Sequence, residues 1–159
     1  MKHRLRFVLL AISTMLGCTH TARLYPVQGP LSAQTPVPVL MAKITGAFTP
    51  GNISVILSDG EVCKRRWVIV NPAQAPKGAN TATAPTSAMS AVWDGIYGAG
   101  FYVSRVLGAR YYAQAMVSGN RGTILNVEMY RPVSGADTDI GAIKGVAKDN
   151  KDNVYKLVL

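Results

Sequence analysis

The chain has 159 residues, of which 48% are hydrophobic, and this size suits one domain with a sizeable core. Its formal net charge of +9 predicts either an anionic partner or a solvated basic surface. The two histidines, His3 and His20, both precede the expected folded domain, which argues against Ser-His-Asp or Cys-His catalysis and against histidine-based zinc sites. We therefore expect no enzyme, no metal site and no cofactor.

The N-terminal segment has the layout of a secretory signal. Basic residues at positions 2, 4 and 6 precede an apolar run over 7–16, which is shorter than the roughly 20 residues that a helix needs to span a bilayer. With Gly17 and Cys18 at its end, the segment resembles the lipobox of bacterial lipoproteins, in which the signal is cut before an acylated cysteine. The resemblance implies a signal peptide over 1–17 and a lipid anchor on Cys18, with the bilayer as partner.

The residue after the cysteine bears on the location. Gram-negative lipoproteins that stay at the inner membrane often carry Asp there, so Thr19 implies the outer membrane, with the domain facing the periplasm or the cell surface. Anionic partners in that compartment are lipids, acidic glycans or envelope proteins rather than nucleic acid. The alternatives are a secreted protein with a free Cys18 and an uncleaved N-terminal anchor.

The chain from residue 18 to residue 38 is predicted to be the lipidated cysteine and a tether, because four prolines between 26 and 38 exclude regular helix. A single mainly β domain is expected over 39–159. Its first strands are predicted over 39–48, 53–57 and 62–70, with Asp59-Gly60 in a hairpin turn.

The strand over 62–70 carries the candidate site residues. Lys64, Arg65 and Arg66 form a basic run that predicts contact with an anionic surface, although solvated surface charge is the simpler interpretation. Cys63 is left without an intramolecular partner if Cys18 is acylated. A lone cysteine in an apolar strand indicates buried packing, whereas neighbouring cations favour a reactive thiol with a lowered pKa.

The second half of the chain begins with residues 71–86, which include no large apolar residue and are predicted to be a mobile loop. A helical apolar stripe follows over 89–97 and ends at Gly98. Further strands are predicted over 101–107, 111–117, 123–130, 140–147 and 154–159. The pattern predicts an antiparallel sandwich or small barrel of about seven to nine strands with one short helix.

Several short motifs follow one another along the chain in a characteristic order. They are Leu24-Tyr25-Pro26-Val27, Gly60-Glu61-Val62-Cys63 with Trp67, Trp93-Asp94, the stretch 97–102, and a closing Gly145-Val146-Ala147 with Tyr155-Lys156-Leu157. This order resembles a family of small, uncharacterised proteobacterial lipoproteins. The family pattern has glycine where Lys64-Arg65-Arg66 stand here, so this chain is unusually basic at that point. Because the family has no known activity, the resemblance implies fold and location only.

Carboxylates are the residues that glycan hydrolysis would require. Glu61, Asp94 and Glu128 are candidates for an acid and base pair, but no spacing in the sequence brings them together. Asp149 and Asp152 resemble a calcium loop only in composition, and a polar hairpin turn is the simpler interpretation.

The sequence therefore predicts a membrane-anchored lipoprotein without catalysis, which serves as a binding or envelope-assembly accessory. One alternative is a small β-barrel inhibitor or ligand carrier similar to lysozyme-inhibitor lipoproteins. The other is a glycan-acting enzyme, which requires two carboxylates about 5 to 9.5 Å apart in a cleft.

Overall fold

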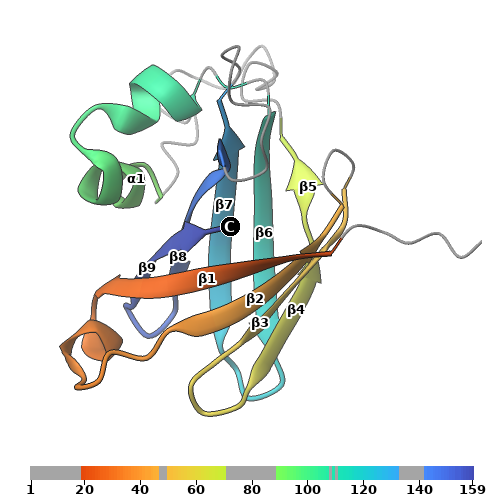
Figure 1. Ribbon diagram of the computed structural model, residues 1–159, viewed down its shortest axis with the longest axis vertical. Helices are drawn as coiled ribbons and strands as arrows, with labels where there is room; N and C mark the ends of the chain where they lie inside the picture. Colours follow the sequence, from red (N-terminus) through yellow and green to blue (C-terminus); the bar gives the residue numbers. More distant parts are fainter. Residues whose placement is uncertain (1–18, 47–49, 71–88, 108, 110, 133–141) are drawn as a thin grey trace, which may run out of the picture.

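The computed structural model describes residues 19–46, 50–70, 89–107, 109, 111–132 and 142–159. Within this part of the chain, eight antiparallel strands close into a barrel and one extra strand pairs at its side (Figure 1). The predicted mainly β fold with one short helix is thereby confirmed, in its barrel form. The predicted signal peptide, Cys18 and the predicted loop over 71–86 lie outside the described residues.

Most neighbouring strands of the barrel are consecutive in the chain, whereas the β1–β9 and β4–β6 pairs join distant segments. They are β1 (Thr19–Gln28), β2 (Leu40–Thr45), β3 (Asn52–Ile56), β4 (Val62–Arg66), β5 (Val68–Ile69), β6 (Tyr111–Gly119), β7 (Ile124–Arg131), β8 (Lys144–Asp149) and β9 (Val154–Val158). Their order in the sheet is β4-β3-β2-β1-β9-β8-β7-β6-β5. The barrel closes where β4 pairs with β6, with Cys63 opposite Gly119 and Lys64 opposite Ser118.

The barrel interior is filled by the side chains that alternate inward along each strand. They form one buried cluster, which includes Ala22, Leu24, Leu40, Ala42, Ile53, Val55, Val117, Leu125, Val127, Ala147, Tyr155 and Leu157. Trp67, between β4 and β5, joins this cluster and donates from Nε1 to the Thr45 carbonyl at 2.9 Å. Burial of this apolar area is the main force that holds the strands together.

Strand β1 corrects the prediction of a tether over 18–38. Ala22 and Leu24 are fully buried in the barrel, and Pro26 is tolerated because the register with β9 shifts between Pro26 and Gln28. His20 also lies in β1, so the prediction that both histidines lie outside the folded domain is wrong. Its Nε2 is buried and has no hydrogen-bond partner among the described residues. The prolines that follow lie around a short 3-10 helix, η1 (Pro30–Ala33), which leads to β2.

The predicted helix is confirmed as α1 (Ser90–Tyr97). The prediction of a strand over 101–107 is wrong, because this segment includes a π-helical turn, η3 (Tyr102–Val106). Gly98 and Gly100, with φ of 109° and 77°, turn the chain between the two helices. The Asp94 carboxylate then accepts a hydrogen bond from the Tyr102 backbone N–H at 2.8 Å, which satisfies the start of the second helix.

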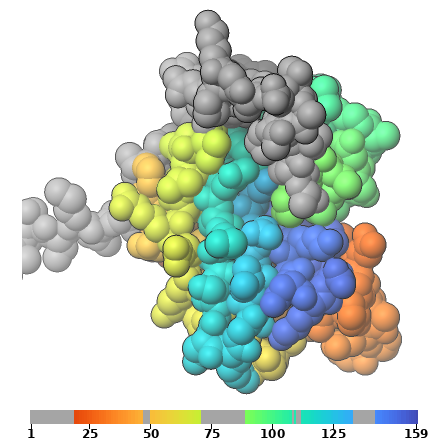
Figure 2. Space-filling model, turned by 180° about the vertical axis from the view of Figure 1, so that it is seen from behind, coloured from red at the N-terminus to blue at the C-terminus, as the bar shows by residue number. Residues whose placement is uncertain are grey.

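These helices cover one side of the barrel, which we call the covered wall and define as the outer surface of β6–β9 beneath α1 and η3 (Figure 1). Trp93 is fully buried there and stacks on Tyr97 and Phe101, with Tyr130 edge-on. Figure 2 shows the barrel from behind, with β6 and β7 in cyan beside the green helices. The outer surface of β1–β4 forms the other side of the barrel, which we call the open wall (Figure 1).

Candidate functional site

The predicted lipidation residue, Cys18, precedes the described chain, which begins at Thr19 as the first residue of β1. The helices among the described residues are too short or too polar to cross a membrane. The residue that follows the predicted anchor is therefore already part of a barrel strand.

The predicted basic run lies in β4, where the alternation of a strand separates its members. Lys64 and Arg66 point outward on the open wall. Arg65 alternates to the inner side, opposite Ile53, but its side chain is exposed. All three cations are accessible to solvent, as an anion-binding role requires.

The strand register adds a fourth cation, Lys43, that the sequence analysis missed. Lys43 of β2 lies opposite Ser54 of β3, and Ser54 lies opposite Lys64 of β4. Neighbouring strands are about 4.8 Å apart, so the two lysines flank Ser54 at about 10 Å from each other. Thr21 of β1 continues the same row beyond Lys43. The row presents two ammonium groups and two hydroxyl groups to one side of the barrel.

A second row on the open wall is apolar. It consists of Met41, Ile56 and Val62, each opposite the next in register, and Arg23 of β1 lies opposite Met41 at its end. The exposed fractions of Met41, Ile56 and Val62 are 42%, 46% and 38%, which is unusual for neighbouring apolar residues on a solvated sheet. The open wall thus combines cations with exposed apolar surface.

The two rows line a hollow of about 670 Å³, which we call the basic groove. Its lining is made of Thr21, Met41, Ala42, Lys43, Asn52, Ile53, Ser54, Ile56, Val62, Lys64, Arg65 and Arg66, with no carboxylate among them. The ion pairs seen among the described residues, Arg121 with Asp59 and Lys148 with Asp152, involve none of these cations. Cations gathered without acidic neighbours attract an anion, because it offsets their mutual repulsion.

A smaller hollow of about 340 Å³ lies between α1 and the edge formed by β1 and β9. Lys156 is the charged residue in its lining, which otherwise includes Val92, Ile96 and Val154. Lys156 Nζ is 5.3 Å from the centre of the Tyr97 ring, so an aromatic face already accompanies this cation. This hollow offers fewer polar groups to a charged ligand than the basic groove does.

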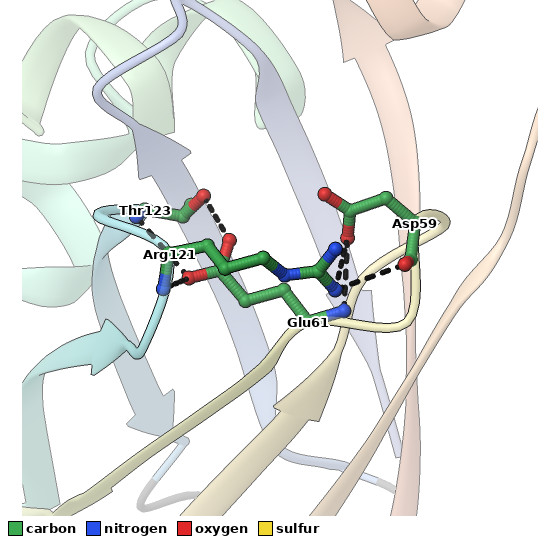
Figure 3. A network of polar contacts seen from close by, with 4 residues as sticks. All are labelled: Asp59, Glu61, Arg121 and Thr123. Carbon is green, nitrogen blue, oxygen red and sulfur yellow. Dashed lines mark hydrogen bonds and ion pairs between the residues drawn. The ribbon is translucent and has the colours of Figure 1, made fainter.

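Glu61, one of the three candidate carboxylates, is a structural group at the end of the barrel (Figure 3). It accepts hydrogen bonds at 2.6 Å from the Arg121 backbone N–H and from the Thr123 hydroxyl. The Thr123 hydroxyl holds the pKa of this carboxyl below its usual range. Arg121 also pairs with Asp59 at 3.5 Å, so the network joins the β3–β4 and β6–β7 turns.

Glu128 and Asp94 belong to other networks. Glu128 is buried in the covered wall, where Trp93 Nε1 donates to it at 2.7 Å and Gln114 Nε2 donates at 3.2 Å. Asp94 accepts the backbone N–H of Tyr102, as described above. Each candidate carboxylate therefore has a structural partner of its own, and neither the basic groove nor the smaller hollow includes a carboxylate.

The acidic turn between β8 and β9 is a hairpin turn. Asp149 is buried and accepts hydrogen bonds from the backbone N–H groups of Lys151 and Asn153, and from the Tyr155 hydroxyl at 2.7 Å. Within the part of the chain that the structure describes, no group of three or more histidine, cysteine or acidic residues is placed to hold a metal ion. The polar contacts of Asp149 explain the composition of this turn.

Cys63 lies in the barrel core with no exposed surface and is not in a disulfide. Burial raises the pKa of its thiol, in spite of the neighbouring Lys64 and Arg65. A protonated, inaccessible thiol is a poor nucleophile. The structure therefore supports the packing interpretation of Cys63.

The part of the site that sequence analysis missed had a visible signal. Thr21 and Arg23 alternate with Ala22 and Leu24, which is the pattern of a half-buried strand. Reading this stretch as a tether concealed the pattern.

No protein-family model, no curated protein and no solved structure matches the chain.

Proposed function

We propose that this protein is a lipid-anchored, non-catalytic accessory of the bacterial envelope that binds an anionic component through the basic groove. The observation that carries the binding role is the groove itself, where Lys43 and Lys64 flank Ser54 beside exposed apolar residues and no carboxylate. Cations and apolar surface together favour a partner that is acidic and partly apolar.

The anchoring role rests on the lipobox resemblance that ends at Cys18. Each buried methylene of an acyl chain contributes about 0.8 kcal/mol, so one chain holds a protein marginally and several chains hold it stably. Thr19 after the cysteine favours the outer membrane of a Gram-negative cell, with the barrel in the periplasm or at the surface.

The proposal that the protein is not catalytic rests on the contacts and burial of the candidate catalytic residues. Glu61, Asp94 and Glu128 each accept hydrogen bonds that hold separate parts of the fold. Cys63 is enclosed in the core. These contacts favour stabilising roles over acid–base or nucleophilic ones.

The experiment for the anchor compares the wild type with Cys18→Ala, expressed in a Gram-negative host, by intact mass and membrane fractionation. We expect a lipid mass and membrane association for the wild type, and neither for Cys18→Ala. Cys63→Ala is the matched control, because it removes the other cysteine and should keep the lipid. Soluble, unmodified wild-type protein would contradict the proposal.

The experiment for the groove is cation-exchange chromatography of Lys43→Glu/Lys64→Glu beside Arg105→Glu/Lys151→Glu. Both variants make the same change in net charge, but only the first removes the groove cations. Because a resin binds through local charge, the groove variant should elute at clearly lower salt. Equal elution of the two variants would show that the groove is not the dominant anionic contact.

The closed eight-stranded barrel also keeps open the alternative of a small inhibitor or ligand carrier. The filled interior requires such a ligand to bind on the outside of the barrel. Inhibition of lysozyme by the purified protein, abolished by Lys43→Glu/Lys64→Glu, would favour this alternative over the envelope accessory.

A further inference from the structure

The start of β1 lies at the same end of the barrel as the outer cations of β4. Thr19 is opposite Thr45, whose hydroxyl accepts the Asn52 backbone N–H at 2.9 Å, and Asn52 is opposite Arg66. Three strand spacings separate Thr19 from Arg66, which is about 14 Å. A lipid on the preceding residue would therefore enter the membrane close to the basic groove.

The groove then continues along the strands from this point. The row of Thr21, Lys43, Ser54 and Lys64 is two residues further along β1, or about 7 Å. The apolar row that starts beside Arg23 follows after the same distance. Cations and apolar residues thus extend from the attachment point across the open wall.

The described carboxylates are concentrated at the other end of the barrel. Asp59 and Glu61 lie at the β3–β4 turn, and Asp149 and Asp152 lie at the β8–β9 turn. Register places both turns at the end away from Thr19, because β4 begins beside the first turn and ends at Arg66, and Val154 after the second turn pairs with Gln28 at the far end of β1. The basic groove therefore lies toward the attachment point, whereas four of the six described carboxylates lie at the other end of the barrel.

We infer that the open wall lies against the anionic headgroups of the membrane that holds the anchor, an inference that rests on the lipid anchor proposed above. The lipid holds the first strand at the bilayer surface, because the residue that follows the predicted anchor is already part of that strand. Lys43, Lys64 and Arg66 then meet lipid phosphates at a high effective concentration. Met41, Ile56 and Val62 would contact the headgroup and acyl boundary, as the apolar residues of interfacial proteins do.

The anchor and the groove would act as two membrane signals on one protein. Attraction to anionic lipid adds for each cation near the surface and falls off within a Debye length. The lipid alone would hold the protein but leave the barrel free to rotate about residue 18. The groove would select one orientation, in which α1 and the covered wall face away from the bilayer.

The test uses the lipidated protein in vesicles, with a fluorophore attached to one introduced cysteine. Ser54→Cys places the probe in the basic groove, and Asn126→Cys places it on the exposed outer face of β7, across the barrel from β2. Cys63 is fully buried and Cys18 would carry the lipid, so the introduced thiol is the accessible one. The vesicles contain brominated phosphatidylcholine as quencher, with or without phosphatidylglycerol.

We expect the Ser54 probe to be quenched in vesicles with phosphatidylglycerol and to recover when salt is raised to 1 M, where the Debye length falls to about 3 Å. The Asn126 probe should remain unquenched in both. Lys43→Glu/Lys64→Glu should abolish quenching at Ser54 while the protein stays on the vesicle. Arg105→Glu/Lys151→Glu, with the same net charge, should not.

Several outcomes would overturn the inference, and they separate it from the proposal about the anchor. A lipid mass together with equal quenching of both probes, or with none, would leave the anchor and refute the orientation. Self-quenching between labelled copies would show that a second copy covers the groove. An intact mass without lipid would refute the anchor, and the orientation with it.

Discussion

The covered wall and the open wall are built from the same kind of strand but present different outer surfaces. On the covered wall, outward residues such as Tyr112, Tyr130 and Val146 are buried beneath the helices, and Glu128 has its hydrogen-bond donors. On the open wall, Met41 and Ile56 stand exposed among cations without an acidic neighbour in the groove.

This difference shows that closing the barrel buries only the inward-facing side chains. The outer apolar residues of β6–β9 that lie beneath α1 and η3 are buried by these helices, whereas Met41 and Ile56 of the open wall stay exposed. For the open wall, the cover proposed above is an anionic membrane surface outside the chain.

Trp93→Ala should have the largest effect on the covered wall. The ring is fully buried, and its loss should lower the free energy of unfolding by about 3 to 5 kcal/mol, as measured by urea denaturation. Trp93→Phe keeps an aromatic ring but removes the shorter of the two hydrogen bonds to Glu128, leaving the one from Gln114, and should cost about 1 to 3 kcal/mol. Equal losses for the two variants would mean that the hydrogen bond, and not packing, holds the helices.

Val146→Ala and Val62→Ala make the same change on the two walls. Val146 is fully buried under the helices, so its truncation should cost about 2 kcal/mol. Val62 is 38% exposed on the open wall, and its truncation should alter stability by no more than about 0.5 kcal/mol. Equal values in urea denaturation would remove the distinction between a covered and an uncovered surface.

Gly119→Ala probes the seam where the two walls join. An added Cβ would overlap the Glu61 carboxylate and lie 2.8 Å from Cys63 Sγ, so we expect a loss of about 1 to 3 kcal/mol in thermal or urea unfolding. Gly95→Ala is the control, because an added Cβ on α1 meets no atom within 4 Å. That variant should gain up to about 1 kcal/mol through helix propensity. If Gly119→Ala left the stability unchanged, the side chains around the β4–β6 pairing would have moved to accommodate the added Cβ.

The same seam should make stability depend on pH. The folded-state pKa of Glu61 lies below its ordinary value of 4.5, chiefly because the Thr123 hydroxyl donates to it, so its contribution is present above pH 4.5 and is lost as the pH falls through the folded-state value. The melting temperature should fall on acidification, and less steeply in Glu61→Gln. Identical slopes for the two proteins would exclude Glu61 as a source of acid sensitivity.

The smallest effect on stability is expected in the basic groove. Lys43→Glu/Lys64→Glu should change the free energy of unfolding by no more than about 0.5 kcal/mol, because both side chains are exposed and have no ion-pair partner in the groove. Circular dichroism during urea unfolding measures this change. A large loss would show that these lysines hold the fold and would weaken their use as binding-site probes.

Local patterns predicted the elements whose signals lie close together in the sequence. The apolar stripe of α1 and the Asp59-Gly60 hairpin are both present in the structure. A strand was predicted for the segment after α1 because Phe101 and Val103 stand at alternate positions, as the residues on one face of a strand do. Tyr102 and Val106, four residues apart, are the buried pair, and the Asp94 side chain caps the turn.

The candidate site was predictable only in part, for a physical reason. Lys64, Arg65 and Arg66 are consecutive, so their charge is visible without a structure. Lys43 joins Lys64 through two strand pairings, and such register depends on contacts between distant segments. The strand β1 was missed because Pro26 suggested a tether, whereas the register shift at that point accommodates the ring.

The pairing of β4 with β6 also hides backbone groups through which copies of this protein could associate on a crowded surface. An open sheet offers rows of unpaired backbone groups on which another chain can add as a strand, and confinement to a bilayer would raise the rate of such encounters. Here the eight barrel strands pair in a ring, and the extra strand β5 is only the two residues Val68–Ile69. Closure therefore protects the protein from edge-to-edge aggregation under the conditions where a lipid anchor would make aggregation most frequent.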